Sequence, residues 1–229
     1  MNVAFSLYIL TLAVLSQQNP TMRSEAAASA ATQELQVLRL ARARKLLRAR
    51  DVLQSGLPTI ALTRLVQAGK LERVARGLYG IPGAKTSEHR SLAEVCARVP
   101  RGVVCLLSAL RVHEIGTQAP FEVWLAIPQH MVAPRLDQPA IRVVRMSDAA
   151  LAEGIERLMI DGVKVPVFSA ARTVVDCFRF RNKIGLDVAL EALREGWSQR
   201  KFALDDLWRY ATRGRVANVM RPYVEAITA

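Results

Sequence analysis

The chain has 229 residues, of which 51% are hydrophobic, and its formal net charge is +12. This length allows one large domain or two small ones around a real core, and the ordinary hydrophobic content excludes a largely disordered chain. The excess of positive charge favours anionic partners, with nucleic acid ahead of a membrane surface, and three cysteines without CxxC spacing argue against a disulfide framework or a zinc site.

The first 33 residues are expected to form an extension outside the folded domains. Residues 3–15 are apolar, but no cation precedes them as in a signal peptide, and 13 residues are too few to span a bilayer comfortably. We favour translation from Met22, with an export signal and a loosely ordered extension as alternatives. Residues 22–33 are rich in Ala, Ser and Thr and are expected to fray. We expect a cytoplasmic protein without membrane association.

Residues 34–83 are predicted to form a winged helix-turn-helix domain. The first helix starts at Glu34, and its apolar residues recur at helical spacing up to Leu46 and Leu47. A second helix would direct Val52 and Leu53 toward a core and end at a glycine. The arginines around the end of the first helix are either a solvated face or a flank for a nucleic-acid backbone: Arg42, Arg44 and Arg48.

The third helix is predicted over residues 59–68, and a tight glycine-containing turn joins it to the second in the manner of a helix-turn-helix. Pro58 and Thr59 suit a helix start, since proline is tolerated in a first turn and threonine is a capping residue type. Its inner face would be apolar: Leu62, Leu65 and Val66. Its outer face would be polar: Thr59, Thr63, Arg64 and Gln67.

A basic hairpin is predicted next, with strands LERV and LYGI and a turn at Ala75-Arg76-Gly77. Residues 34–82 contain ten cations and three anions, which is +7 of the total charge. We therefore expect this domain to bind double-stranded DNA, with helix 59–68 in the major groove. The hairpin would contact phosphates or the minor groove through Lys70, Arg73 and Arg76. A winged helix used only for protein contact is the alternative.

Residues 91–229 are predicted to form a larger α+β domain with a small, mostly antiparallel sheet and a helical C-terminal tail. Helices are expected at 91–99 and 103–113, and strands at 121–128 and 140–146. Residues 159–168 contain an Asp161-Gly162 hairpin signal. The remaining helices are expected at 170–180, where Ser169 would be the cap, and at 184–197, 202–214 and 216–227.

No catalytic constellation stands out in this second region. A restriction-type nuclease needs a Glu-x-Lys on a strand, but Glu122-Val123-Trp124 has tryptophan in place of the lysine. The Gly-Ser pair and Asp-x-Asp of a nucleotidyltransferase are missing, as is a glycine-rich phosphate loop. Arg172 and Asp176 lie four residues apart and are expected to form a local ion pair. We predict a protein without enzymatic activity, metal or cofactor.

Four segments in this order resemble the AbiEi-type antitoxins of bacterial type IV toxin–antitoxin systems: LVQAGKLERVARGLYGIP, LLSALRVHEIG, FEVWLAIP and VPVFSAARTVVDCF. The resemblance covers roughly residues 36–225. It implies a winged helix that represses its own operon at inverted repeats, with basic contacts from Arg64, Lys70, Arg73 and Arg76. It also implies a C-terminal domain that counteracts a nucleotidyltransferase-like toxin without a stable complex.

Three other functions remain open from the residues themselves. The chain is alternatively a plain winged-helix regulator without a toxin partner. It is alternatively a winged helix fused to a nuclease-like domain, which the missing Glu-x-Lys disfavours. A module that binds a toxin directly is the third alternative.

Overall fold

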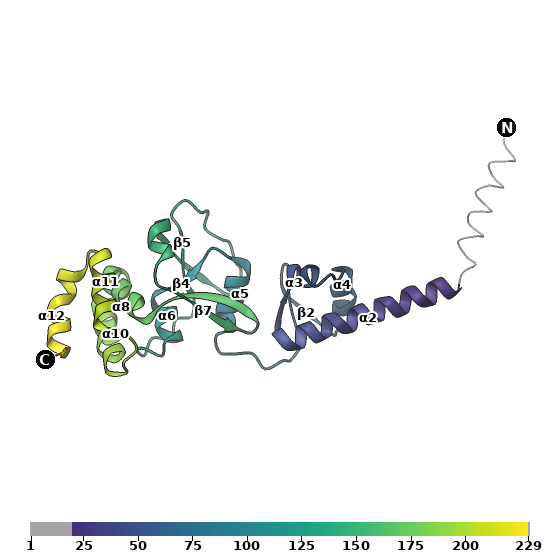
Figure 1. Ribbon diagram of the computed structural model, residues 1–229, viewed down its shortest axis with the longest axis horizontal. Coiled ribbons are helices and arrows are strands. Elements are labelled where there is room, and N and C mark those ends of the chain that lie inside the picture. Colours follow the sequence, from purple (N-terminus) through teal and green to yellow (C-terminus); the bar gives the residue numbers. More distant parts are fainter. Residues whose placement is uncertain (1–19, 229) are drawn as a thin grey trace, which may run out of the picture. The chain divides into compact units, whose positions relative to one another are not determined.

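A computed structural model describes residues 20–228, and the chain divides into two compact units between Ala84 and Lys85 (Figure 1). The expectation for residues 3–15 lies outside the described residues. Of the helices in the described part, none has both the length and the apolar character needed to cross a membrane.

The first unit combines helices with a three-stranded antiparallel sheet of order β1-β3-β2. Its described elements follow one another as α2 (Pro20–Arg44), β1 (Leu46–Arg48), α3 (Ala49–Gln54), α4 (Ile60–Gln67), β2 (Glu72–Ala75) and β3 (Leu78–Gly80). The two short helices and the closing hairpin agree with the predicted winged helix-turn-helix, whereas the strand β1 was not predicted.

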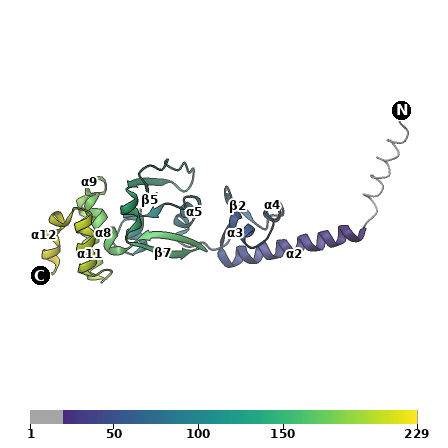
Figure 2. The same ribbon diagram turned by 45° about the horizontal axis from the view of Figure 1, so that its top comes forward.

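Helix α2 is longer than the sequence suggested. Residues 22–33, expected to fray, belong to this helix, and its N-terminal part extends past α3 and α4 in Figures 1 and 2. Alanine is the strongest helix former, so an alanine-rich segment can continue a helix whose C-terminal part is held by packing. That packing comes from the buried residues Val37, Leu38 and Ala41.

The end of the first helix also differs from the prediction. Leu46 and Leu47 do not continue it but form β1, where both are fully buried and pair with β3. Lys45 has φ 61°, a left-handed conformation that ends the helical repeat. Leu53, which was expected to face the core, is 60% exposed, whereas Val52 is buried as predicted.

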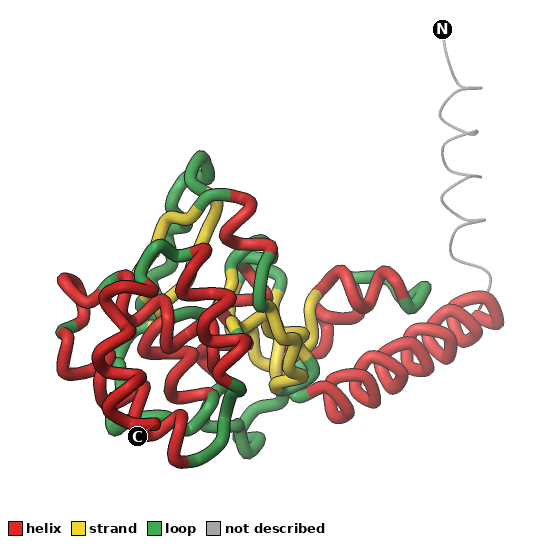
Figure 3. Tube along the Cα trace, turned by 60° about the vertical axis from the view of Figure 1, so that its left-hand side comes forward, coloured by secondary structure: helices red, strands yellow, loops and turns green. Residues whose placement is uncertain are grey.

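The second unit is an α+β structure, as predicted. Its first part contains α5 (Arg90–Arg98), β4 (Val103–Val104), α6 (Leu106–Val112), β5 (Val123–Pro128), β6 (Ile141–Met146), α7 (Asp148–Ala152), β7 (Ile155–Ile160) and β8 (Val163–Phe168). The predicted helical tail follows as α8 (Ala170–Arg179), α9 (Arg181–Ile184), α10 (Leu186–Ser198), α11 (Leu204–Arg213) and α12 (Ala217–Thr228). Figure 3 shows these C-terminal helices gathered together.

The five-stranded sheet has the order β6-β5-β4-β8-β7. Its β4–β5 and β7–β8 pairs are antiparallel, but its β5–β6 and β4–β8 pairs are parallel, so the sheet is more evenly mixed than expected. The sequence signals an antiparallel pair only where a tight turn joins two strands. The Asp161-Gly162 turn does so, with both φ values positive, and joins β7 to β8 as predicted. Residues 103–104, predicted to start a helix, form β4 instead.

All six residues of β5 are buried, because helices cover both faces of the sheet. Trp124 and Ala126 belong to the core that also contains residues of α6, α7 and α8. Leu125 lies between these two residues in the strand and so points to the opposite face of the sheet. Helix α5, which contacts β5 and β8, covers that face. The same large core includes Phe168 and Phe178, which connect the sheet to the C-terminal helices.

Candidate nucleic-acid interface

Helix α4 has one buried and one exposed face. Leu62 and Leu65 are buried and Val66 is half-buried, in agreement with the predicted inner face. The predicted outer residues are all exposed: Thr59, Thr63, Arg64 and Gln67. Thr59 occupies the N-cap position, but its side chain makes no capping hydrogen bond. An exposed hydroxyl at the start of this helix is therefore not engaged in capping.

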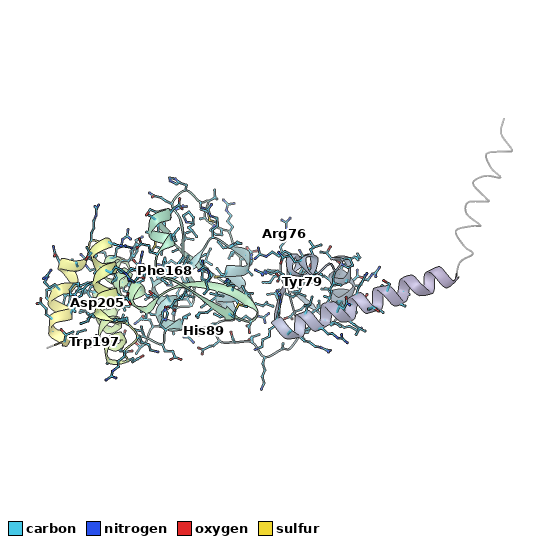
Figure 4. The ribbon with its side chains drawn as sticks, in the orientation of Figure 1. Arg76, Tyr79, His89, Phe168, Trp197 and Asp205 are labelled. Carbon is cyan, nitrogen blue, oxygen red and sulfur yellow. The ribbon has the colours of Figure 1, made fainter. Side chains whose placement is uncertain are left out.

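The predicted hairpin is present with a shorter turn. Ala75 belongs to β2, so that Arg76 and Gly77 alone connect the strands. Gly77 has φ 70°, the left-handed conformation that glycine adopts without strain. Val74 is the extra residue of a bulge between Arg73 and Ala75. Figure 4 shows the Arg76 side chain projecting from the first unit.

Four basic side chains of this region have no partner within the described part of the chain. Arg64, Lys70, Arg73 and Arg76 are exposed, and none forms an ion pair or side-chain hydrogen bond with another described residue. Exposed cations of this kind are available to the phosphates of a nucleic acid. The structure thus places all seven predicted site residues at the surface of α4 and of the segment that follows it.

Two other arginines have a structural role instead. Arg48 donates Nε and Nη2 to the carboxylate oxygens of Asp51 at 2.9 and 2.8 Å, and Arg44 lies 3.3 Å from the same carboxylate. Burial raises the pKa of Asp51, but the hydrogen bonds and charge of Arg48, together with Arg44, outweigh it and lower the pKa overall. Of the arginines suggested as a flank, only the exposed Arg42 has no such partner among the described residues.

Arg64 lies close to the long first helix. It lines a surface hollow of about 490 Å³ together with Glu34 and alanines of α2. Glu34 is the acidic residue of this hollow, and it reduces the local positive potential next to Arg64. None of the other predicted site residues lines this hollow.

Sequence reasoning missed Ile60 as a surface residue. It is 53% exposed on α4, three and four residues before Thr63 and Arg64. An apolar side chain at this position can contact a thymine methyl group in a major groove. The spacing of three and four residues from Thr63 and Arg64 could have indicated that Ile60 lies on the same outer face of the helix. The exposed Arg39 and Arg50 were likewise not assigned to the site.

The second unit shows no metal centre among its described residues, since no group of three or more His, Cys, Asp and Glu side chains could hold an ion. His113 donates a hydrogen bond from Nε2 to the carbonyl oxygen of Phe168, with 2.7 Å between nitrogen and oxygen. Asp205 and Asp206 lie in the first turn of α11, where their negative charges interact favourably with the helix dipole.

The geometry defines a basic helix-turn-helix with a hairpin, followed by an α+β unit. Residues 35–82 match a family model described as "Transcriptional regulator, AbiEi antitoxin". The match covers the helix-turn-helix and hairpin, confirms the resemblance over these residues, and supports a role as an antitoxin or transcriptional regulator.

A solved structure is similar over most of the chain. It is the crystal structure of the RV2827C protein from Mycobacterium tuberculosis, which is 17% identical in sequence to this chain and matches it with a TM-score of 0.53. The matched region covers 79% of this chain and 71% of the RV2827C chain. At this identity the likeness concerns the fold alone. A comparison with curated proteins gave no match.

Proposed function

We propose that this protein is a transcriptional regulator that binds double-stranded DNA through its first unit. The supporting observation is the set of exposed cations at Arg64, Lys70, Arg73 and Arg76, which have no partner among residues 20–228 and lie next to the polar outer face of α4. Helix α4 enters the major groove, and its side chains contact base edges. The basic residues after it neutralise phosphates and fix the protein on the duplex.

The operator is an inverted repeat upstream of the protein's own gene, so that binding represses the operon. A two-fold symmetric site requires two copies of the short α4 helix, each reading one half-site. The family description over residues 35–82 supports the regulatory role.

The DNA-binding proposal is tested on the full chain with a labelled fragment of the upstream region. Binding is measured by mobility shift and footprinting in excess competitor DNA, at several salt concentrations. A discrete protected inverted repeat is expected. Sequence-independent binding that is lost uniformly with salt would leave only a basic surface and refute the operator.

The same protein acts as the antitoxin of a nucleotidyltransferase-like toxin, without enzymatic activity of its own and in the cytoplasm. This role is supported by the antitoxin description of the matched family. Co-expression with the product of the neighbouring gene should restore growth, and the two proteins should not co-purify as a stable complex. Failure of rescue would leave a plain regulator. Metal-dependent DNA cleavage by the purified chain would instead support the nuclease alternative.

A further inference from the structure

A surface cavity of about 420 Å³ lies between α7, α8 and α11 of the second unit, and its floor contains a buried ion pair. Arg172 and Asp176 are 6% and 1% exposed, and Nε of Arg172 donates to Oδ2 of Asp176 at 2.9 Å. The sequence predicted this local ion pair but gave no indication of its burial. Its burial is unexpected, because two desolvated charges seldom stabilise a fold more than well-packed apolar residues do.

The guanidinium of Arg172, a residue of the cavity lining, has donors that are not used within the described part of the chain. Its Nε donates to Asp176, but Nη1 and Nη2 form no hydrogen bond with any residue that the structure describes. Neither atom is among the buried side-chain atoms that lack a partner, so both retain contact with solvent. Since Arg172 is part of the cavity lining, its Nη1–Nη2 fork is the group that it can offer to a ligand there.

Aromatic rings fix the direction of this fork. The guanidinium carbon of Arg172 lies 4.9 Å from the ring centroid of Phe168 and 5.9 Å from that of Tyr210. Figure 4 marks Phe168 within the second unit. An arginine held by two rings and one carboxylate loses little conformational freedom when it binds an anion.

Two more arginines line the same cavity. Arg213 contacts Glu153 at 2.7 Å, whereas Arg179 is exposed and forms no ion pair with a described residue. Arg172 pairs with Asp176, and Arg213 pairs with Glu153. Arg179 therefore gives the cavity lining one positive charge that no carboxylate of the lining neutralises. Burial raises the pKa of Asp176, although Arg172 and Arg179 oppose this, so the floor carboxylate is less firmly charged than an exposed one.

We propose that this cavity binds the phosphate group of a small ligand, with the Nη1–Nη2 fork of Arg172 holding two phosphate oxygens and Arg179 closing over a third. A planar guanidinium fork matches phosphate geometry, and phosphate is recognised mainly through such charge-assisted hydrogen bonds. The cavity volume is that of a small-molecule site. This site is separate from the DNA interface and does not depend on it.

The test is calorimetric titration of the full chain with inorganic phosphate and, separately, with adenosine 5′-monophosphate, at constant ionic strength in sodium chloride. Saturable binding of at least one probe is expected. Tighter binding of the nucleotide than of inorganic phosphate would show that the cavity also contacts the nucleoside. Equal affinity for the two probes would show that the cavity recognises the phosphate group alone. Absence of saturable binding by both probes would overturn the proposal.

Substitutions of the cavity arginines and of arginines elsewhere test whether the measured binding takes place in this cavity. Arg179→Ala should weaken it at least about tenfold, because one charge-assisted contact is lost. Arg172→Lys keeps the charge but removes the fork and should weaken it similarly, with folding checked by circular dichroism. Arg221→Ala, an exposed arginine of α12 outside the cavity, and Arg76→Ala in the first unit should have no effect. Equal affinity of Arg179→Ala and the unmodified chain would refute the site even if Arg172→Lys fails to fold.

Discussion

The main-chain amide of Ala49 donates a hydrogen bond to the carbonyl oxygen of Gly77, with 2.9 Å between nitrogen and oxygen. This bond joins the start of α3 to the hairpin turn, and β1 pairs with β3 just beside it. Arg76 is therefore part of a turn that is attached to α3 by this bond and to β1 through the pairing of β3. Because the backbone is already ordered, little conformational entropy is lost when the hairpin meets DNA.

Arg76→Ala should weaken binding to operator and random DNA to a similar extent, since a phosphate contact carries no base information. The slope of log K against log salt concentration should become shallower by about 1, as expected for one phosphate contact fewer. Mobility shifts over a salt series measure both quantities. Arg221→Ala, in the second unit, is the matched control and should leave the slope unchanged. An unaltered slope for Arg76→Ala would exclude a phosphate contact.

Arg64→Ala should cost about 1–3 kcal/mol of operator binding and relax the preference for one base pair, because Arg64 lies on the outer face of α4. Competition between operator and random fragments separates the loss of base preference from the loss of overall affinity. Equal losses of Arg64→Ala on both fragments would show that Arg64 does not read bases.

Glu34→Gln is the complementary change. It removes the negative charge from the hollow beside Arg64, so affinity for DNA should rise modestly.

Asp51→Asn should destabilise the first unit by about 1–3 kcal/mol at neutral pH, because hydrogen bonds to a charged, buried carboxylate are lost. The pKa of Asp51 is lowered in the folded state from 3.8, so its stabilising contribution is present above that value. It disappears as pH falls through the folded-state pKa. Urea unfolding at several pH values should show the two proteins converging in acid. A pH-independent difference would contradict this assignment.

Gly154→Ala should destabilise the second unit by about 2–4 kcal/mol. Gly154 has φ +64°, and an added Cβ would lie 2.9 Å from the Tyr210 hydroxyl and 3.1 Å from Cβ of Arg172. Gly116→Ala is the control, with φ +77° but only ordinary contact with the Glu191 carboxylate at 3.4 Å. Its loss should be about 1–2 kcal/mol, from backbone strain alone. Tryptophan fluorescence reports on this unit, and equal losses would argue against the contact with Tyr210.

The three cysteines should react slowly with thiol reagents in the folded protein. Cys96, Cys105 and Cys177 are buried and free. Burial raises the pKa of Cys96 to about 12 and that of Cys177 further, so the reactive thiolate is scarce at pH 8. Ellman's reagent should modify all three rapidly only in denaturant. Rapid labelling of the folded chain at one of them would show that its surroundings open in solution.

Much of the first unit was predictable from sequence, because its signals are local. Helical spacing separated Leu62 and Leu65 from Thr63 and Gln67, and the structure has the former buried and the latter exposed. Gly77 indicated the hairpin turn through its conformational freedom. β1 was not predictable in this way, because Leu46 and Leu47 also fit a helical pattern and become a strand only by pairing with β3.

The sequence by itself determined the class of fold, the concentration of cations in residues 34–82 and which side of α4 is polar, since all three depend on residue type and short spacing. Only the tertiary structure decided which charges are free. Arg48 and Arg64 look alike in the sequence, but the first is bound to Asp51 and the second is not. It also decided that the Arg172–Asp176 pair is buried beneath a cavity. Both pairs are close in sequence, but their burial depends on segments that are distant along the chain, so no local pattern encodes it.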